Sequence, residues 1–256
     1  MKGWGIVLIA VLLLLVAPGR QGRCDEPADP CDVPEDLSLV NFPADHVYDR
    51  IHANQPIRLL VIGSTSSSSA TIWSGRGQVS AFRAFPRFLE GAMAALRPGL
   101  RTVVTDRTAA GQTVTMVLAQ LPSLLAQGPF DLVVWEAGTT DAVRRLDVNA
   151  FGDSLDEGLK LIAAKGLDAI LVDVQYSPQT DALYDFQPYL DYLQEEAESV
   201  GANLLRRHEI MRFYVDNGRF DPGAPGPVEQ MKNATFVHQC LAKRLATMIL
   251  TAGQVQ

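Results

Sequence analysis

Five short apolar segments alternate with segments of helical pattern along most of this chain. They are rich in Leu, Val and Ile and are bounded by turn residues, which is typical of strands buried on both faces. Strands that alternate with helices form parallel sheets covered on both sides. The sequence therefore predicts an α/β fold, a three-layer α/β/α sandwich around a five-stranded parallel sheet. The expected strands are residues 57–62, 100–105, 130–137, 169–174 and 203–205.

Helices are expected between these strands. Residues 81–96 space Phe85, Leu89 and Met93 so that one face of a helix meets a core, with Pro86 near the start, where a missing N–H is tolerated. Further helices are expected at residues 113–126, 149–165, 182–200, 207–217 and 234–250.

The first 23 residues have the pattern of an export signal. Lys2 supplies a positive charge, and residues 4–17 are an unbroken apolar run that is shorter than the roughly 20 residues a bilayer span needs. We expect a signal peptide at residues 1–23, a periplasmic or secreted protein, and no membrane span in the mature chain. An uncleaved tether remains an alternative, because residues 17–19 match a cleavage site poorly.

The remaining chain divides at the first strand. Residues 24–56 contain five prolines and many acidic residues, which predicts an extended N-terminal segment, and residues 57–256 form the globular domain. Removing residues 1–23 takes away three basic residues and no acidic one, so the net charge falls from −7 to −10. A protein with this negative net charge repels a phosphate backbone, so we expect no nucleic-acid partner.

Three cysteines leave one without a partner if a disulfide forms. An exported protein meets an oxidising compartment, where disulfides persist. We predict a bond between Cys31 and Cys240, which would fasten the N-terminal segment to the last helix. The alternative is a short-range bond between Cys24 and Cys31.

A cluster of hydroxyl side chains follows the first strand. The apolar run stops at Gly63 and continues as Ser64, Thr65 and Ser66 to Ser69. Ligands bind at the carboxyl ends of strands in open parallel sheets, so these hydroxyls are expected to face a crevice. The alternative is a polar, flexible loop without a catalytic role.

Several motifs resemble the SGNH (GDSL-type) hydrolase superfamily, and the resemblance covers about residues 57–250. The fold that it implies is flavodoxin-like, and the activity that it implies is ester hydrolysis by a Ser nucleophile after the first strand. The motifs are GSTSS at residue 63, GTTDA at 138, QYSP at 175, HEIMRFYVDNGRFD at 208 and VHQCLAKRLA at 237.

The resemblance assigns Thr65 to the nucleophile position, and Ser64 or Ser66 could replace it only with a shifted turn. A threonine can attack, although its methyl group crowds the approach. Gly111 matches the glycine of the oxyanion hole, and Thr140 stands where the family has an asparagine donor.

Asp141 matches the family's aspartate, which we interpret as supporting its loop through backbone bonds. The family's Asp-x-x-His motif would fall at Pro227–Gln230 or Glu229–Lys232, and neither window contains histidine. His238 is then the candidate base, displaced along the last helix, although it could instead pack against the sheet. His208 is expected to cap a helix or to lie at the surface.

Two functions remain open from the sequence. One is an exported hydrolase of ester bonds, for example acyl or acetyl esters of envelope glycans or lipids, with a small-molecule or glycan ester as substrate. The other is a catalytically degenerate member of the same fold that binds or scaffolds in the cell envelope. We expect no cofactor and no metal, because dinucleotide, P-loop and zinc motifs are absent from the sequence.

Overall fold

A computed structural model describes residues 29–64, 71–74, 77–81 and 84–254. For residues 71–74 and 77–81 it describes the backbone alone. At its centre is a five-stranded sheet in which every pairing is parallel, in the order β4-β1-β5-β6-β7. This is the predicted sheet. Its strands are β1 (Ile57–Gly63), β4 (Thr102–Asp106), β5 (Leu132–Glu136), β6 (Asp168–Val172) and β7 (Asn203–Leu205).

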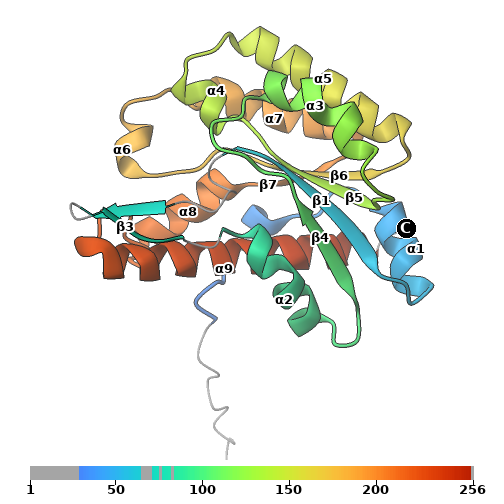
Figure 1. The fold of residues 1–256 in the computed structure, drawn as a ribbon, viewed down its shortest axis with the longest axis horizontal. Helices are drawn as coiled ribbons and strands as arrows, with labels where there is room; N and C mark the ends of the chain where they lie inside the picture. Colours follow the sequence, from blue (N-terminus) through green and yellow to red (C-terminus); the bar gives the residue numbers. More distant parts are fainter. Residues whose placement is uncertain (1–28, 65–70, 75–76, 82–83, 255–256) are drawn as a thin grey trace, which may run out of the picture.

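Helices cover both faces of the sheet (Figure 1), which confirms the predicted three layers. One face packs against α1 (Asp45–His52), α2 (Pro86–Leu96), α8 (Arg207–Asp216) and α9 (Gly226–Ala252). The other packs against α3 (Val114–Leu125), α5 (Val148–Ala164) and α7 (Gln187–Val200). The shorter elements are η1 (Glu35–Ser38), β2 (Thr71–Ser74), β3 (Gly77–Ala81), α4 (Thr139–Val143) and α6 (Pro178–Asp181).

Strand β1 shows why both faces need cover. Leu59 and Val61 lie in the core beneath α2 and α9, whereas Leu60 and Ile62 lie in the core beneath α3 and α5. All four side chains are fully buried. Side chains alternate between the two faces of a strand, so an uninterrupted apolar run is stable only where helices cover both.

Four expectations differ from the structure by more than two residues, and one is the helix expected at 182–200, because α7 begins only at Gln187. The segment before β1 is not extended throughout, because η1 and α1 form within it and α1 buries Val47 and Ile51. Helix α2 begins at Pro86 rather than at residue 81, where β3 ends. The last helix begins at Gly226, eight residues before the predicted start, because Pro227 lies in its first turn, where proline is tolerated.

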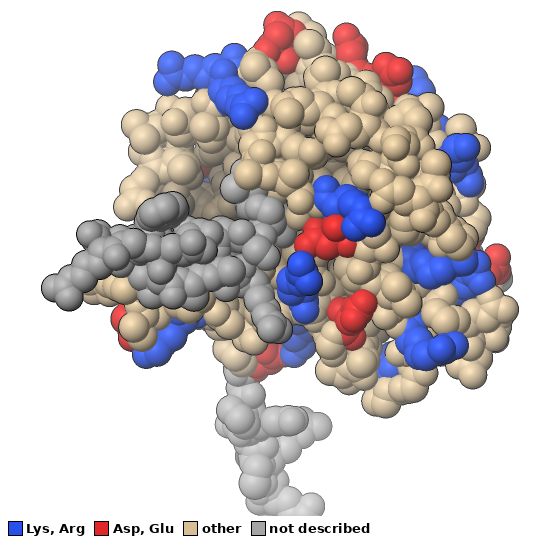
Figure 2. Space-filling model, in the orientation of Figure 1, with Lys and Arg blue, Asp and Glu red and all other residues tan. Residues whose placement is uncertain are grey.

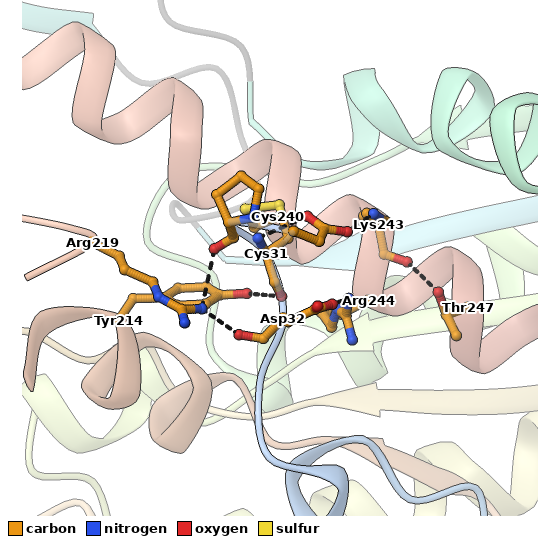
Figure 3. Close-up of a disulfide and its surroundings, with 10 residues drawn as sticks. Cys31, Asp32, Tyr214, Arg219, Cys240, Lys243, Arg244 and Thr247 are labelled. Atoms are coloured by element: carbon orange, nitrogen blue, oxygen red, sulfur yellow. Dashed lines mark hydrogen bonds and ion pairs between the residues drawn. A yellow bond between two sulfur atoms is a disulfide. The ribbon is translucent and has the colours of Figure 1, made fainter. Parts of the chain in front are cut away.

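A disulfide joins Cys31 to Cys240 on α9, which is the predicted long-range pairing; Cys24 lies outside the described residues. Figure 3 shows the polar contacts that surround the bond. The hydroxyl of Tyr214 donates a hydrogen bond to the Cys31 carbonyl at 2.8 Å, and Arg244 forms an ion pair with Asp32 at 3.0 Å. These contacts fasten the N-terminal segment to α8 and α9.

Among the described residues, no helix combines the length and the apolar character needed to cross a bilayer. Figure 2 shows basic and acidic side chains interspersed over the visible face of the molecule.

Candidate active site at the carboxyl edge of β4, β1 and β5

The three strands that carry the family motifs are neighbours in the sheet, so their following loops meet at one edge. The backbone of Ala109 donates a hydrogen bond to the Gly63 carbonyl at 3.1 Å, which places the loop after β4 beside the end of β1. The backbone of Val114 donates to Asp141 Oδ1 at 3.0 Å, which ties the same loop to α4. The three loops therefore meet at the carboxyl edge of the sheet.

Gly63 ends β1 in a backbone conformation that other residues rarely adopt, with φ of +133°. A Cβ atom added there would lie 2.3 Å from the Glu136 carbonyl oxygen. Only glycine allows β1 to lie this close to β5 while the chain turns out of the sheet. The turn that leads into the hydroxyl cluster thus depends on this residue.

Of the predicted nucleophiles, Thr65 and Ser66 lie outside the described residues. Ser64 is described and is buried, with its hydroxyl donating a hydrogen bond to Glu136 Oε1 at 3.1 Å. Its side chain is therefore directed toward the end of β5. This contact favours a supporting role for Ser64 rather than attack on a substrate.

Glu136 and Arg207 form an ion pair that the sequence did not predict. Arg207 Nη1 lies 2.7 Å from Glu136 Oε1, and both side chains are at most 1% exposed. Arg207 Nη2 also donates to Thr139 Oγ1 at 3.0 Å. Burial raises the pKa of the Glu136 carboxyl, and the Arg207 guanidinium opposes this rise. The signal for this pair was a glutamate at the end of an otherwise apolar strand.

The predicted oxyanion residues lie on the loop after β4 and on α4. Gly111 has φ of +70°, and a Cβ atom there would meet the Arg144 guanidinium at 3.0 Å. Thr140 lies in the first turn of α4 and is half-buried. Both positions belong to the edge at which the three loops meet.

Asp141 is buried in α4 and accepts a hydrogen bond from the backbone of Val114. Burial raises the pKa of its carboxyl, and nearby backbone N–H groups oppose this rise. These backbone bonds are those expected of a residue that supports its loop.

His238 lies on α9 and is 7% exposed. Its Nδ1 accepts a hydrogen bond from the backbone of Phe85 at 3.2 Å, so the neutral ring holds its proton on Nε2. Burial, together with the charge of Arg207, lowers the pKa of His238 to about 3. In this tautomer Nε2 is a donor, which disfavours the role of general base that the sequence suggested.

Of the two expectations for His208, the surface position is wrong, because its ring is only 7% exposed, whereas its place at the start of a helix agrees with the first turn of α8. Its Nε2 lies 3.0 Å from Asp181 Oδ1, and Tyr176 packs edge-on against the ring. Burial lowers the pKa of His208, and Asp181 opposes this shift. Its backbone donates to Asp173, which supports the start of α8.

The described residues contain no group of three or more His, Cys, Asp or Glu side chains placed to hold a metal ion. Among the described residues, Ser64, Gly111 and Thr140 lie around the ends of the three strands. Hydroxyl groups and backbone amides are the kinds of donor that stabilise negative charge developing on a carbonyl oxygen.

Comparisons with known proteins agree with this arrangement. Residues 30–255 match the non-GDSL lipase-like family. An arylesterase of Vibrio mimicus is 27% identical over 195 residues, which cover 73% of this chain and 90% of the relative.

Solved structures share the fold. A lipase/acylhydrolase from Enterococcus faecalis superposes with a TM-score of 0.60 at 15% identity, covering 78% of this chain and 97% of that one. An acetyl-xylooligosaccharide esterase from Geobacillus gives a TM-score of 0.59 at 19% identity, covering 75% and 94%. Residues 30–255, which match the family, include the sheet and the loops described above, and the chain belongs to the non-GDSL lipase-like family of SGNH-type hydrolase fold.

Proposed function

We propose that this chain hydrolyses esters of small acyl groups at the carboxyl edge of β4, β1 and β5. The observation that supports this function most directly is the convergence of the β1 turn, Gly111 and Thr140 at one edge of the sheet. A hydroxyl group of the loop at residues 65–69 is the proposed nucleophile, with Thr65 at the position that the family resemblance assigns.

The rate of the proposed reaction depends more on stabilising the negative charge of the oxyanion than on a histidine that acts as a base. The Gly111 amide and the Thr140 hydroxyl are the proposed donors to the oxyanion, and one such donor contributes about 100-fold to 1000-fold in rate. Enzymes that lose a triad member still retain about 1000-fold to 10000-fold over water from the oxyanion hole and binding. We therefore expect a slow esterase.

The test is hydrolysis of a panel of short aryl esters by the purified protein. Thr140→Val should lower kcat by about 100-fold, because it removes a hydroxyl and keeps the shape of the side chain. Thr115→Val is the matched control, because Thr115 lies on the exposed side of α3, where its hydroxyl contacts Ser154. Equal loss in both variants, or no turnover by the wild type, would contradict the proposal.

A finer proposal concerns the substrate and its location. The disulfide between Cys31 and Cys240 and the signal-like first 23 residues support export to the periplasm or the exterior. Acyl or acetyl esters of envelope glycans or lipids are then the substrates that such an enzyme would meet. Release of acetate from acetylated glycan fragments, measured against the short aryl esters, tests this choice.

The second candidate is a binding or scaffolding protein of the cell envelope that uses the same edge without catalysis. The observation that favours it is His238, whose Nδ1 accepts the Phe85 amide hydrogen and whose ring stays neutral. Glycan binding that persists in Thr65→Ala, together with no turnover and no reaction with a fluorophosphonate, would support this candidate over the esterase.

A further inference from the structure

A single guanidinium group holds both ends of the short connection between β5 and α4. Arg207 is the first residue of α8 and is fully buried. Through Nη1 it contacts Glu136, the last residue of β5, and through Nη2 it contacts Thr139, the first residue of α4. Thr139 directly precedes Thr140, one of the proposed oxyanion donors.

The same network reaches the turn after β1. Glu136 Oε1 accepts both the Arg207 guanidinium at 2.7 Å and the Ser64 hydroxyl at 3.1 Å. Ser64 directly precedes Thr65 in the sequence. Thr139 Oγ1 also accepts the backbone amide of Gln175, in the loop after β6, at 2.9 Å. Four segments that are distant in sequence are therefore joined by one buried set of polar contacts.

Stability alone is a weak reason for such a network. A buried ion pair often contributes no more stability than apolar side chains of similar volume, because both charges lose their hydration. The planar fork of arginine, in contrast, holds two acceptors at fixed positions, which a lysine cannot do. The contacts thus indicate that the network fixes the positions of Glu136 and Thr139 relative to α8.

We infer that Arg207 is a positioning residue, which sets the end of β1 at Ser64 and the first turn of α4 at the separation that the proposed reaction requires. The inference rests on the proposed esterase function. Arg207 acts through Glu136 and Thr139 and does not touch the substrate. A displacement of about 1 Å between such groups can cost about 100-fold in rate.

The matched control is the ion pair between Arg58 and Asp131. It lies at the amino ends of β1 and β5, opposite to Ser64 and Glu136, with Arg58 Nη2 at 2.6 Å from Asp131 Oδ1, which is buried. Arg58→Gln should weaken the fold without moving the loops at the carboxyl edge. Arg207→Gln should lower kcat by about 100-fold more than Arg58→Gln does, with little change in KM.

Two further variants separate positioning from folding. Arg207→Lys keeps the positive charge but lacks the planar guanidinium, so its kcat should be as low as that of Arg207→Gln. The double variant Glu136→Met with Arg207→Met removes both buried charges, so it should regain the thermal stability that Arg207→Gln loses while kcat remains low. Recovery of kcat together with stability in the double variant would overturn the inference.

Hydrogen exchange supplies a readout that does not require catalysis. In Arg207→Gln, amides in residues 57–64 and 136–142 should exchange faster than in Arg58→Gln at equal global stability. Unchanged exchange in these segments would overturn the inference even if activity fell. If the wild-type chain cleaves no ester, the proposed function fails, and the exchange comparison still decides whether Arg207 fixes the two segments.

Discussion

Breaking the disulfide between Cys31 and Cys240 should lower the free energy of unfolding by about 2 to 5 kcal/mol. The two cysteines are 209 residues apart, so the bond closes a loop that includes nearly the whole domain. For a loop of that length the chain-entropy relation gives about 5 kcal/mol, which is the upper end of the range that is measured. The Tyr214 and Arg244 contacts remain, so the fold should persist with lower stability.

The assay is thermal unfolding of the double variant Cys31→Ala with Cys240→Ala. For a domain of this size each kcal/mol shifts Tm by about 2 to 4 °C, which predicts a decrease of about 5 to 20 °C. Cys24→Ala is the control and should leave Tm unchanged. An equal loss in Cys24→Ala, or a disulfide-linked peptide containing Cys24 and Cys31 in a non-reduced digest, would refute the reasoning.

Three further predictions test individual positions. Burial holds the pKa of His238 at about 3, below the value of about 6.5 in an unfolded chain, so stability should be lost as pH falls from 6.5 toward 3. His238→Gln, which can still accept the amide hydrogen, should reduce this loss in urea titrations. Burial raises the pKa of Asp173 to about 7 from 3.8, so the native state retains a proton that the unfolded state releases, and stability should fall as pH rises from about 4 to 7. Asp173→Asn should therefore have a higher Tm than the wild type at pH 8, and a lower one would contradict this. Gly63→Ala should destabilise by at least about 1 to 3 kcal/mol through its positive φ and its clash with Glu136, whereas Gly91→Ala in the open middle of α2 should not.

The sequence was sufficient to predict the sheet, because apolar runs of strand length alternate with helices. Each predicted strand is present to within about two residues, and their parallel pairing follows from the connections. The N-terminal segment was harder, since Val47 and Ile51 alone mark the buried side of α1 among many acidic residues and prolines. Its helical state depends on packing against α9 and on Asp168, which accepts the Val47 amide.

The site was predictable only in part. The family resemblance singled out Gly111, Thr140 and Asp141, and each follows a strand of the parallel sheet, where ligands bind. The partnership of Glu136 with Arg207 could not be predicted in the same way, since the two residues are far apart in sequence and are joined only when α8 docks on the sheet. The tautomer of His238 likewise depends on a backbone amide of another element.

The most direct test of the proposed site is reaction with a fluorophosphonate followed by peptide mapping of the modified chain. The account predicts one adduct per chain, on a hydroxyl group within residues 65–69. An adduct that maps to another part of the chain, or a protein that cleaves esters while none of these hydroxyls is modified, would contradict it.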